Sequence, residues 1–269
     1  MIMIILFYLF IFILGAAIGS FLGVIVDRTA SQESFWKGRS HCDHCRHKLH
    51  MLDLIPVLSF FLLKRKCRYC HKELSWFYPL IEFTTGLSYV AAAYVVLQPA
   101  PLMITQLQSQ LLLLYYFLLI GALIAIFFID LKYGIIPFKI VLFALLVTIV
   151  WYVASPIGLP FLISILGAAF GASGFFFLLF LATKGRGMGF GDVVYVFLMG
   201  FTLGFPKILL GLYIAFVVGA IVSLLLIALK KKRFRGGTIP FGPFLVLGTI
   251  TSLLWGDFLI TWILRSLTY

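Results

Sequence analysis

Two aspartates of this chain lie beside long apolar stretches, where carboxylates are unusual. Asp130 closes the hydrophobic stretch 111–129, and Asp192 ends a Gly-x-Gly-Asp motif with Gly189 and Gly191. Placing a charged carboxylate at the centre of a bilayer costs about 2.5–3.5 kcal/mol on insertion scales, so such an acid indicates function. Two carboxyl groups that share a site do not both ionise easily. Such a pair suits aspartyl proteolysis, in which one acid activates water and its protonated partner donates a proton.

The glycines before Asp192 strengthen this interpretation, although a plainer one exists. Because glycine has no side chain, positions 187, 189 and 191 would let a substrate backbone approach the carboxylate closely. Alternatively, both acids lie at solvated helix ends, with Asp192 favoured by the positive end of its helix dipole. The two acids by themselves favour this plainer interpretation, and the other motifs of the chain decide against it.

All four cysteines lie in one loop, in two C-x-x-C pairs. Cys42 and Cys45 form the first pair, and Cys67 and Cys70 form the second. Each pair spans a tight turn that directs two thiolates at one ion, and two such turns complete a tetrahedral site. We predict structural Zn²⁺, because four thiolates leave no open position for catalysis. A redox role and unbound thiols are the alternatives.

The elements that must position these residues are membrane helices. The chain of 269 residues is 63% hydrophobic and 11% charged, which excludes a soluble globular class. Windows long enough for a bilayer core of ~30 Å predict spans at 2–26, 76–97, 111–129, 138–154, 161–182, 208–229 and 245–264. Counting the short apolar segment 193–203 as a further span, we predict an all-α polytopic membrane protein with about eight transmembrane helices.

Lysine and arginine set the predicted orientation of these spans. With eight spans, all of the 21 lysine and arginine residues except Lys207 and Arg265 fall on one side. The positive-inside rule makes the crowded side cytoplasmic, so the cysteine loop and both aspartates are expected there and both termini outside. The net charge of +12 is expected to face anionic membrane lipid, and it gives no reason to predict a nucleic-acid partner.

These predictions divide the chain into three segments. Residues 1–26 form the first transmembrane helix, which lacks the basic start and cleavage site of a signal peptide. In that helix Gly15, Gly19 and Gly23 form a small-residue stripe that predicts helix packing. Residues 27–75 form a small cytoplasmic four-cysteine zinc-binding loop, and residues 76–269 form the membrane core that carries both aspartates.

Taken in order, the motifs of the chain resemble those of the type IV prepilin peptidases, membrane aspartyl proteases of the GxGD class. The likeness runs over nearly the whole chain, with departures from the family pattern at Gly23, Phe138 and Val194. The matching motifs are 19–22, the two cysteine pairs with 53–59 between them, 78–82, Asp130 with Ile136 and Pro137, 188–193 and 239–244.

The resemblance implies a specific reaction at a bacterial plasma membrane. The leader peptide of a type IV pilin-like precursor would be cleaved at the cytoplasmic face, with Asp130 and Asp192 as the catalytic pair and Gly189 and Gly191 in support. The cysteine loop marks members that also methylate the new amino terminus with S-adenosylmethionine, so we expect that activity as well. The glycines at 185–191 do not follow a strand and are not a dinucleotide-binding loop.

Two further acids lie in predicted membrane spans. Glu82 is expected either to support the site, by orienting a catalytic group or contacting substrate, or to make a structural hydrogen bond to a neighbouring helix. Asp257 lies in the last span and is expected to pack against a polar partner.

Two alternative functions stay open on the sequence, and a third is disfavoured by it. One is a protease-only member without methyltransferase activity, and another is a non-enzymatic membrane scaffold whose zinc loop binds a cytoplasmic partner. A transporter with a proton relay would favour acids near mid-membrane and an inverted repeat, and neither is visible in the sequence.

Overall fold

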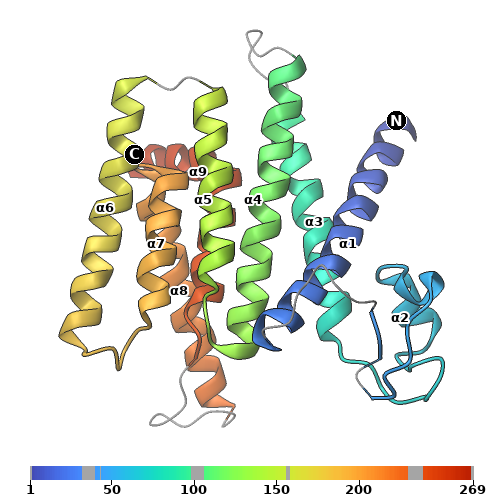
Figure 1. Cartoon of the computed structure of the whole chain (residues 1–269). Coiled ribbons are helices and arrows are strands. Elements are labelled where there is room, and N and C mark those ends of the chain that lie inside the picture. Colours follow the sequence, from blue (N-terminus) through green and yellow to red (C-terminus); the bar gives the residue numbers. More distant parts are fainter. Residues whose placement is uncertain are drawn as a thin grey trace. The chain divides into compact units, whose positions relative to one another are not determined.

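The computed structural model describes residues 2–31, 40–42, 44–97, 106–155, 158–229 and 239–267. Among these residues the regular structure is helical, apart from two isolated β-bridges. The prediction of an all-α fold is therefore confirmed. The helices are α1 (Ile2–Ser31), η1 (Met51–Leu54), α2 (Leu58–Leu62), α3 (Phe77–Leu97), α4 (Gln106–Tyr133), α5 (Phe138–Ala154), α6 (Leu159–Ala182), α7 (Phe190–Leu203), α8 (Lys207–Ala228) and α9 (Gly242–Leu267) (Figure 1).

Six of these helices, α1, α3, α4, α6, α8 and α9, are long and apolar enough to cross a membrane by length and composition. Helices α5 and α7 are shorter apolar helices. The short segment 193–203 is helical as predicted, but its helix begins at Phe190 and has 14 residues, about 21 Å at 1.5 Å per residue. The chain is thus a membrane protein with six long and two short apolar helices among its described residues. The basic residues at 37, 39 and 230–235, which contributed to the predicted orientation, lie outside the described residues.

The chain divides into two compact units, Met1–Ala125 and Ile126–Tyr269. In the first unit α1 packs along α3, and the small residues of α1 allow the close approach. A Cβ atom added at Gly19 would lie 2.7 Å from the Cα of Glu82, and one at Gly15 would lie 2.8 Å from the Cα of Gly86. Because only glycine tolerates such spacing, these two positions determine where the helices cross.

The second unit is built around its shortest membrane helix. Helix α7 contacts α5, α6, α8 and α9, and Figure 1 shows it between α5 and α6. Most of its side chains are buried, including Tyr195, whose hydroxyl lies 2.9 Å from the Thr249 hydroxyl of α9. A Cβ atom at Gly200 would lie 2.6 Å from the carbonyl oxygen of Ala168 in α6. The helix that begins with the Gly-x-Gly-Asp motif is therefore held from several sides.

Candidate functional site

Asp130 lies in the last turn of α4, within the second unit. Gly134 ends this helix in the left-handed conformation, with φ of +67°, and its N–H donates to the carbonyl oxygen of Asp130 over 2.8 Å. The Asp130 side chain is buried, and its Oδ2 has no hydrogen-bond partner among the described residues. A buried polar atom without a partner is destabilising, so it is usually retained for a reason other than stability.

Asp192 is the third residue of α7 and is also buried. Its Oδ2 accepts a hydrogen bond of 3.1 Å from the N–H of Gly189, which precedes the helix in an extended conformation. This bond satisfies a donor at the helix start and fixes the carboxylate against the first turn. The predicted location of Asp192 at the start of a helix is therefore observed.

The second unit brings the two aspartates together. Asp192 interacts electrostatically with Asp130, and the side chain of Ile136 lies close to Gly191 and Gly242. A Cβ atom at Gly191 would lie 3.0 Å from the Cβ of Ile136, and one at Gly242 would lie 3.3 Å from its Cδ1. The Gly242 Cβ would also lie 2.5 Å from Oδ2 of Asp130. Gly191, Ile136 and Gly242 thus form the immediate walls of the pair.

The glycines of the site differ in how strictly they are required. At Gly189 an added Cβ would meet its nearest atom, Oδ2 of Asp192, at an ordinary 3.6 Å. Gly191 and Gly242 face much tighter neighbours. Gly242 was not predicted as a site residue, although it lies in the motif 239–244 that precedes the last span. Close approach of a substrate at Gly189 and Gly191 stays a prediction.

Glu82 belongs to the first unit and contacts the cysteine loop. Its Oε2 accepts a hydrogen bond of 2.7 Å from the N–H of Val57. Val57 precedes α2 and has φ of +61°, which is strained for a β-branched residue. Of the two expectations for Glu82, a structural hydrogen bond is therefore observed, because Glu82 accepts from the Val57 N–H of the loop and from the side chain of Ser20 in the neighbouring helix α1.

Asp257 lies in α9 and forms an ion pair with Lys207, whose Nζ is 2.7 Å from its Oδ2. Asp257 therefore has the polar partner expected for it. Its side chain is 86% exposed, so this acid shares neither the burial nor the surroundings of Asp130 and Asp192.

The four cysteines meet at one point of the loop. Their sulfur atoms all lie within 4.8 Å of one another, and the Sγ atoms of Cys42 and Cys70 are 3.9 Å apart. The two pairs fold alike, because the residues after the second cysteines, Arg46 and His71, both have φ of +57°. These turns close with N–H groups that donate to the carbonyl oxygens of Cys42 and Cys67 over 2.9 Å. The cluster could hold a metal ion.

The loop affects the charge of two of the cysteines in opposite directions. Burial opposes ionisation of Cys67, but the backbone N–H groups of Cys70 and Tyr69 outweigh it and lower its pKa to about 7. For Cys70, the N–H of Lys72 favours the thiolate, yet desolvation and the neighbouring sulfurs together raise the pKa to about 11. Cys67 and Cys70 thus differ in how readily they hold negative charge, and a cation would relieve the repulsion among thiolates.

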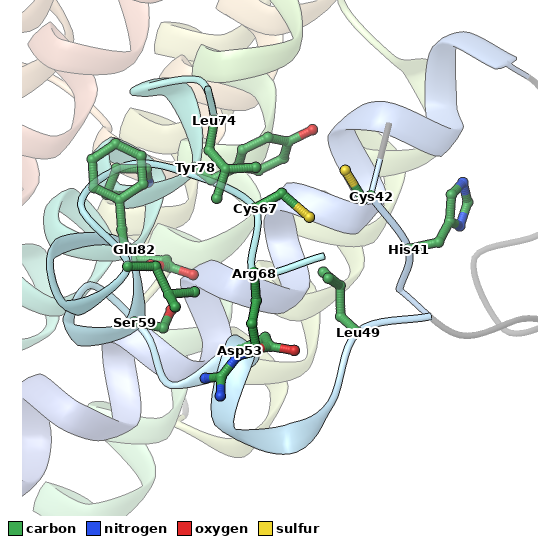
Figure 2. A pocket seen from close by; sticks show the side chains of 13 residues that line it. His41, Cys42, Leu49, Asp53, Ser59, Cys67, Arg68, Leu74, Tyr78 and Glu82 are labelled. Carbon is green, nitrogen blue, oxygen red and sulfur yellow. The ribbon is translucent and has the colours of Figure 1, made fainter. Parts of the chain in front are cut away.

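Asp53 ties the segment between the cysteine pairs to the second pair. It accepts hydrogen bonds from the Arg68 Nε at 2.7 Å, the Tyr69 hydroxyl at 3.1 Å and the His50 N–H at 3.0 Å. Asp53 and Arg68 also border a cavity of about 140 Å³ that reaches Ser59 and Glu82 (Figure 2). The sequence identified Asp53 only as part of a motif, since Arg68 and Tyr69 become its neighbours only when the loop folds.

Both units match known protein families. Residues 13–96 match the bacterial Peptidase A24 N-terminal domain, and residues 117–224 match the type IV leader peptidase family. The first match includes the four cysteines and Glu82, and the second includes Asp130 and Asp192. The cysteine loop and the aspartate pair are thus features of two matched regions.

Relatives cover nearly the whole chain. A prepilin leader peptidase/N-methyltransferase of Aeromonas hydrophila is 30% identical over 297 residues, which cover 97% of this chain and 95% of the relative. Proteins with the same name are 29% identical in Bacillus subtilis (strain 168), over 95% of this chain and 97% of the relative, and in Pseudomonas aeruginosa, over 93% and 91%. No solved structure matches the chain. With identity at this level along both units, the chain belongs to the type IV leader peptidase family.

Proposed function

We propose that this chain is a membrane aspartyl endopeptidase that removes the leader peptide of type IV pilin-like precursors and methylates the new amino terminus. The observation that carries the peptidase activity is the pair of buried, interacting carboxylates, Asp130 and Asp192. The relatives named prepilin leader peptidase/N-methyltransferase support the substrate class and both activities.

In the proposed reaction the two carboxyl groups share one proton and act as a unit. The ionised member takes a proton from the attacking water, and the protonated member gives its proton to the leaving nitrogen of the scissile peptide. The Gly189 N–H holds the Asp192 carboxylate in place. The backbone of Gly242 hydrogen-bonds the Asp130 carboxylate, and the absence of a side chain at this glycine allows that close approach. Positioning two acids in this way is what peptide hydrolysis requires of the protein.

The test of this mechanism compares three aspartates with different surroundings. Asp130→Asn and Asp192→Asn should each lower precursor cleavage by about 10²–10⁴-fold, the usual contribution of general acid–base catalysis. Asp257→Asn, which removes the exposed acid paired with Lys207, is the matched control and should cleave normally. The readout is cleavage of a purified precursor by purified enzyme that accumulates at parental levels. Efficient cleavage by Asp192→Asn would refute the aspartyl mechanism.

We propose that the metal held by the four cysteines is zinc. A tetrahedral ion with Zn–S bonds of about 2.3 Å needs sulfur atoms about 3.8 Å apart, and the 3.9 Å between Cys42 and Cys70 fits this requirement. Bound zinc would supply folding energy to the loop and no catalytic position, because all four of its ligands would be protein thiolates.

For the methylation step we propose S-adenosylmethionine as the donor. The names of the relatives support N-methylation, and the methyl group must come from an activated donor.

We place the cysteine loop and the aspartate pair on the cytoplasmic side and both termini outside. The exposed basic side chains of Lys64 and Lys66 in the loop support this orientation.

A further inference from the structure

The part of the cysteine loop between its two pairs has inverted polarity. Residues 51–62 comprise η1 and α2 and contain a single charged residue, Asp53. The Asp53 side chain is only 3% exposed and points inward to Arg68 and Tyr69. Seven large apolar side chains face outward instead, each between 37% and 83% exposed: Met51, Leu52, Leu54, Ile55, Leu58, Phe61 and Leu62.

The fold of the segment explains this arrangement. In α2, Leu58, Phe61 and Leu62 lie at helical spacing on one exposed stripe. The opposite side of α2 carries Ser59 and Phe60, which line the cavity shown in Figure 2. The inward side of α2 is therefore occupied by Ser59 and Phe60, whereas the stripe is left largely exposed, with ring contacts from Phe61 to Phe60 and Trp76. A contiguous exposed apolar surface of this kind marks an interaction site.

The apolar surface is continuous with the start of a membrane helix. Trp76 directly precedes the apolar span that starts at Phe77, and its ring lies 5.0 Å from that of Phe60 and 6.0 Å from that of Phe61. Tryptophan is enriched at the level of lipid headgroups, so Trp76 indicates the membrane–water interface. Because Phe60 and Phe61 of α2 contact Trp76, helix α2 must lie next to that interface.

Basic side chains border the same surface. Lys64, Arg65 and Lys66 follow α2 after one residue, Leu63, and Lys64 and Lys66 are exposed. The guanidinium of Arg65 lies 5.9 Å from the centre of the Trp76 ring. An apolar face bordered by lysine and arginine is the pattern of segments that lie in the membrane interface and bind anionic headgroups. Charge and apolarity therefore both favour a lipid surface as the occupant.

We propose that residues 51–62 form an interfacial anchor that inserts Leu58, Phe61 and Leu62 into an anionic lipid bilayer. The basic residues 64–66 then contact the headgroups, and the four-cysteine cluster is held at a fixed depth beside the membrane surface. This attachment is additional to the membrane-spanning helices and does not depend on the aspartyl mechanism.

The experiment uses the full chain in vesicles of phosphatidylcholine and phosphatidylglycerol with brominated acyl chains. Leu62→Trp places a fluorescent reporter on the apolar stripe without changing the core. Lys72→Trp places it on an exposed position of the second cysteine turn and is the matched control. The added emission, relative to the parental protein, should be quenched several-fold more by brominated lipid for Leu62→Trp than for Lys72→Trp. It should also be shielded from iodide.

Three results would overturn the proposal. Equal exposure of both reporters to iodide would show that the stripe faces water. Equal quenching by brominated lipid would remove the depth difference. Shielding of Leu62→Trp that appears only after a purified pilin precursor is added would assign the stripe to substrate binding. The metal content of each variant should match that of the parental protein, which verifies that the loop is folded.

Discussion

Gly242 lies directly against the carboxylate of Asp130, so that a Cβ atom at position 242 would be 2.5 Å from Oδ2. The first residue of α9 thereby limits where the last turn of α4 can hold its acid. The same glycine position contacts Ile136, which also lies against Gly191. Substitution of a glycine remote in sequence from both aspartates is therefore expected to disturb the pair.

Gly242→Ala should lower precursor cleavage by about 10²-fold, the usual effect of a misplacement near 1 Å in an active site. The reason is steric, because the Asp130 carboxylate or the start of α9 must move. Gly171→Ala in α6 is the matched control, since no atom lies within 4 Å of the Cβ that it adds. The measurement is kcat/KM with purified precursor. Normal cleavage by Gly242→Ala would show that the carboxylate does not act from its observed position.

Asp130→Asn should separate the two proposed activities. Hydrolysis needs the carboxyl pair and water, whereas methyl transfer needs a bound donor and a free amine, so the variant should still methylate a supplied, already cleaved pilin. Mass spectrometry of that product detects the added methyl group. If the parental enzyme cleaves its precursor completely and the product never gains a methyl mass, the chain is a protease without methyltransferase activity.

The purified chain should contain about one zinc ion, because four thiolates fill one tetrahedral site. Cys42→Ser combined with Cys67→Ser removes the two buried cysteines of the cluster and should abolish metal binding. Proteolysis between residues 27 and 75 should then become faster, since the loop loses the folding energy of the ion. His44→Ala, which alters an exposed neighbour outside the cluster, should keep its zinc. A metal-free parental protein with full activity would contradict the structural role.

Asp53→Asn should loosen the cysteine loop at neutral pH. Desolvation raises the pKa of Asp53, but the His50 N–H, the Tyr69 hydroxyl and Arg68 together hold it below its usual value. A depressed pKa means that the ionised group stabilises the fold above the unfolded-state pKa and loses this effect as the pH falls through the acid range. We expect a loss of about 1–3 kcal/mol in local stability, measured by amide hydrogen exchange within residues 44–74.

Glu73→Gln is the control for Asp53, because it breaks an exposed ion pair with Arg65 in the same loop. Exposed pairs contribute up to about 1 kcal/mol, so its effect should be smaller. Equal exchange rates in the two variants would contradict the role of Asp53 in holding the segment between the cysteine pairs against the second pair.

Glu82→Ala should release Val57 from its strained conformation and accelerate amide exchange in α2. The variant removes the acceptor of the Val57 N–H, whereas Glu82→Gln keeps an acceptor and should exchange slowly. Adding Val57→Gly to Glu82→Ala should partly restore the loop, because glycine adopts positive φ without strain. If Glu82→Gln abolishes cleavage while the loop exchanges normally, Glu82 has a role in the reaction and not only in the loop.

The sequence by itself was sufficient for the features that depend on local pattern. Apolar runs of bilayer length predicted the helices, with 138–154 matching α5 fully and 76–97 differing from α3 by one residue. Paired cysteines predicted the cluster, because each tight turn is a local structure. Both aspartates were expected at helix ends, since Asp130 closes the apolar stretch 111–129 and Asp192 directly precedes the apolar segment 193–203.

Only the tertiary structure decided which residues meet across elements. Three contacts join residues that are distant in sequence. They are the contact of Gly242 with Asp130, the hydrogen bond of Glu82 with Val57 and the hydrogen bond of Asp53 with Arg68. In membrane helices nearly every face is apolar, so hydrophobic periodicity does not reveal which face packs against a neighbour. Close packing of small residues makes that choice, and it is a property of the folded chain alone.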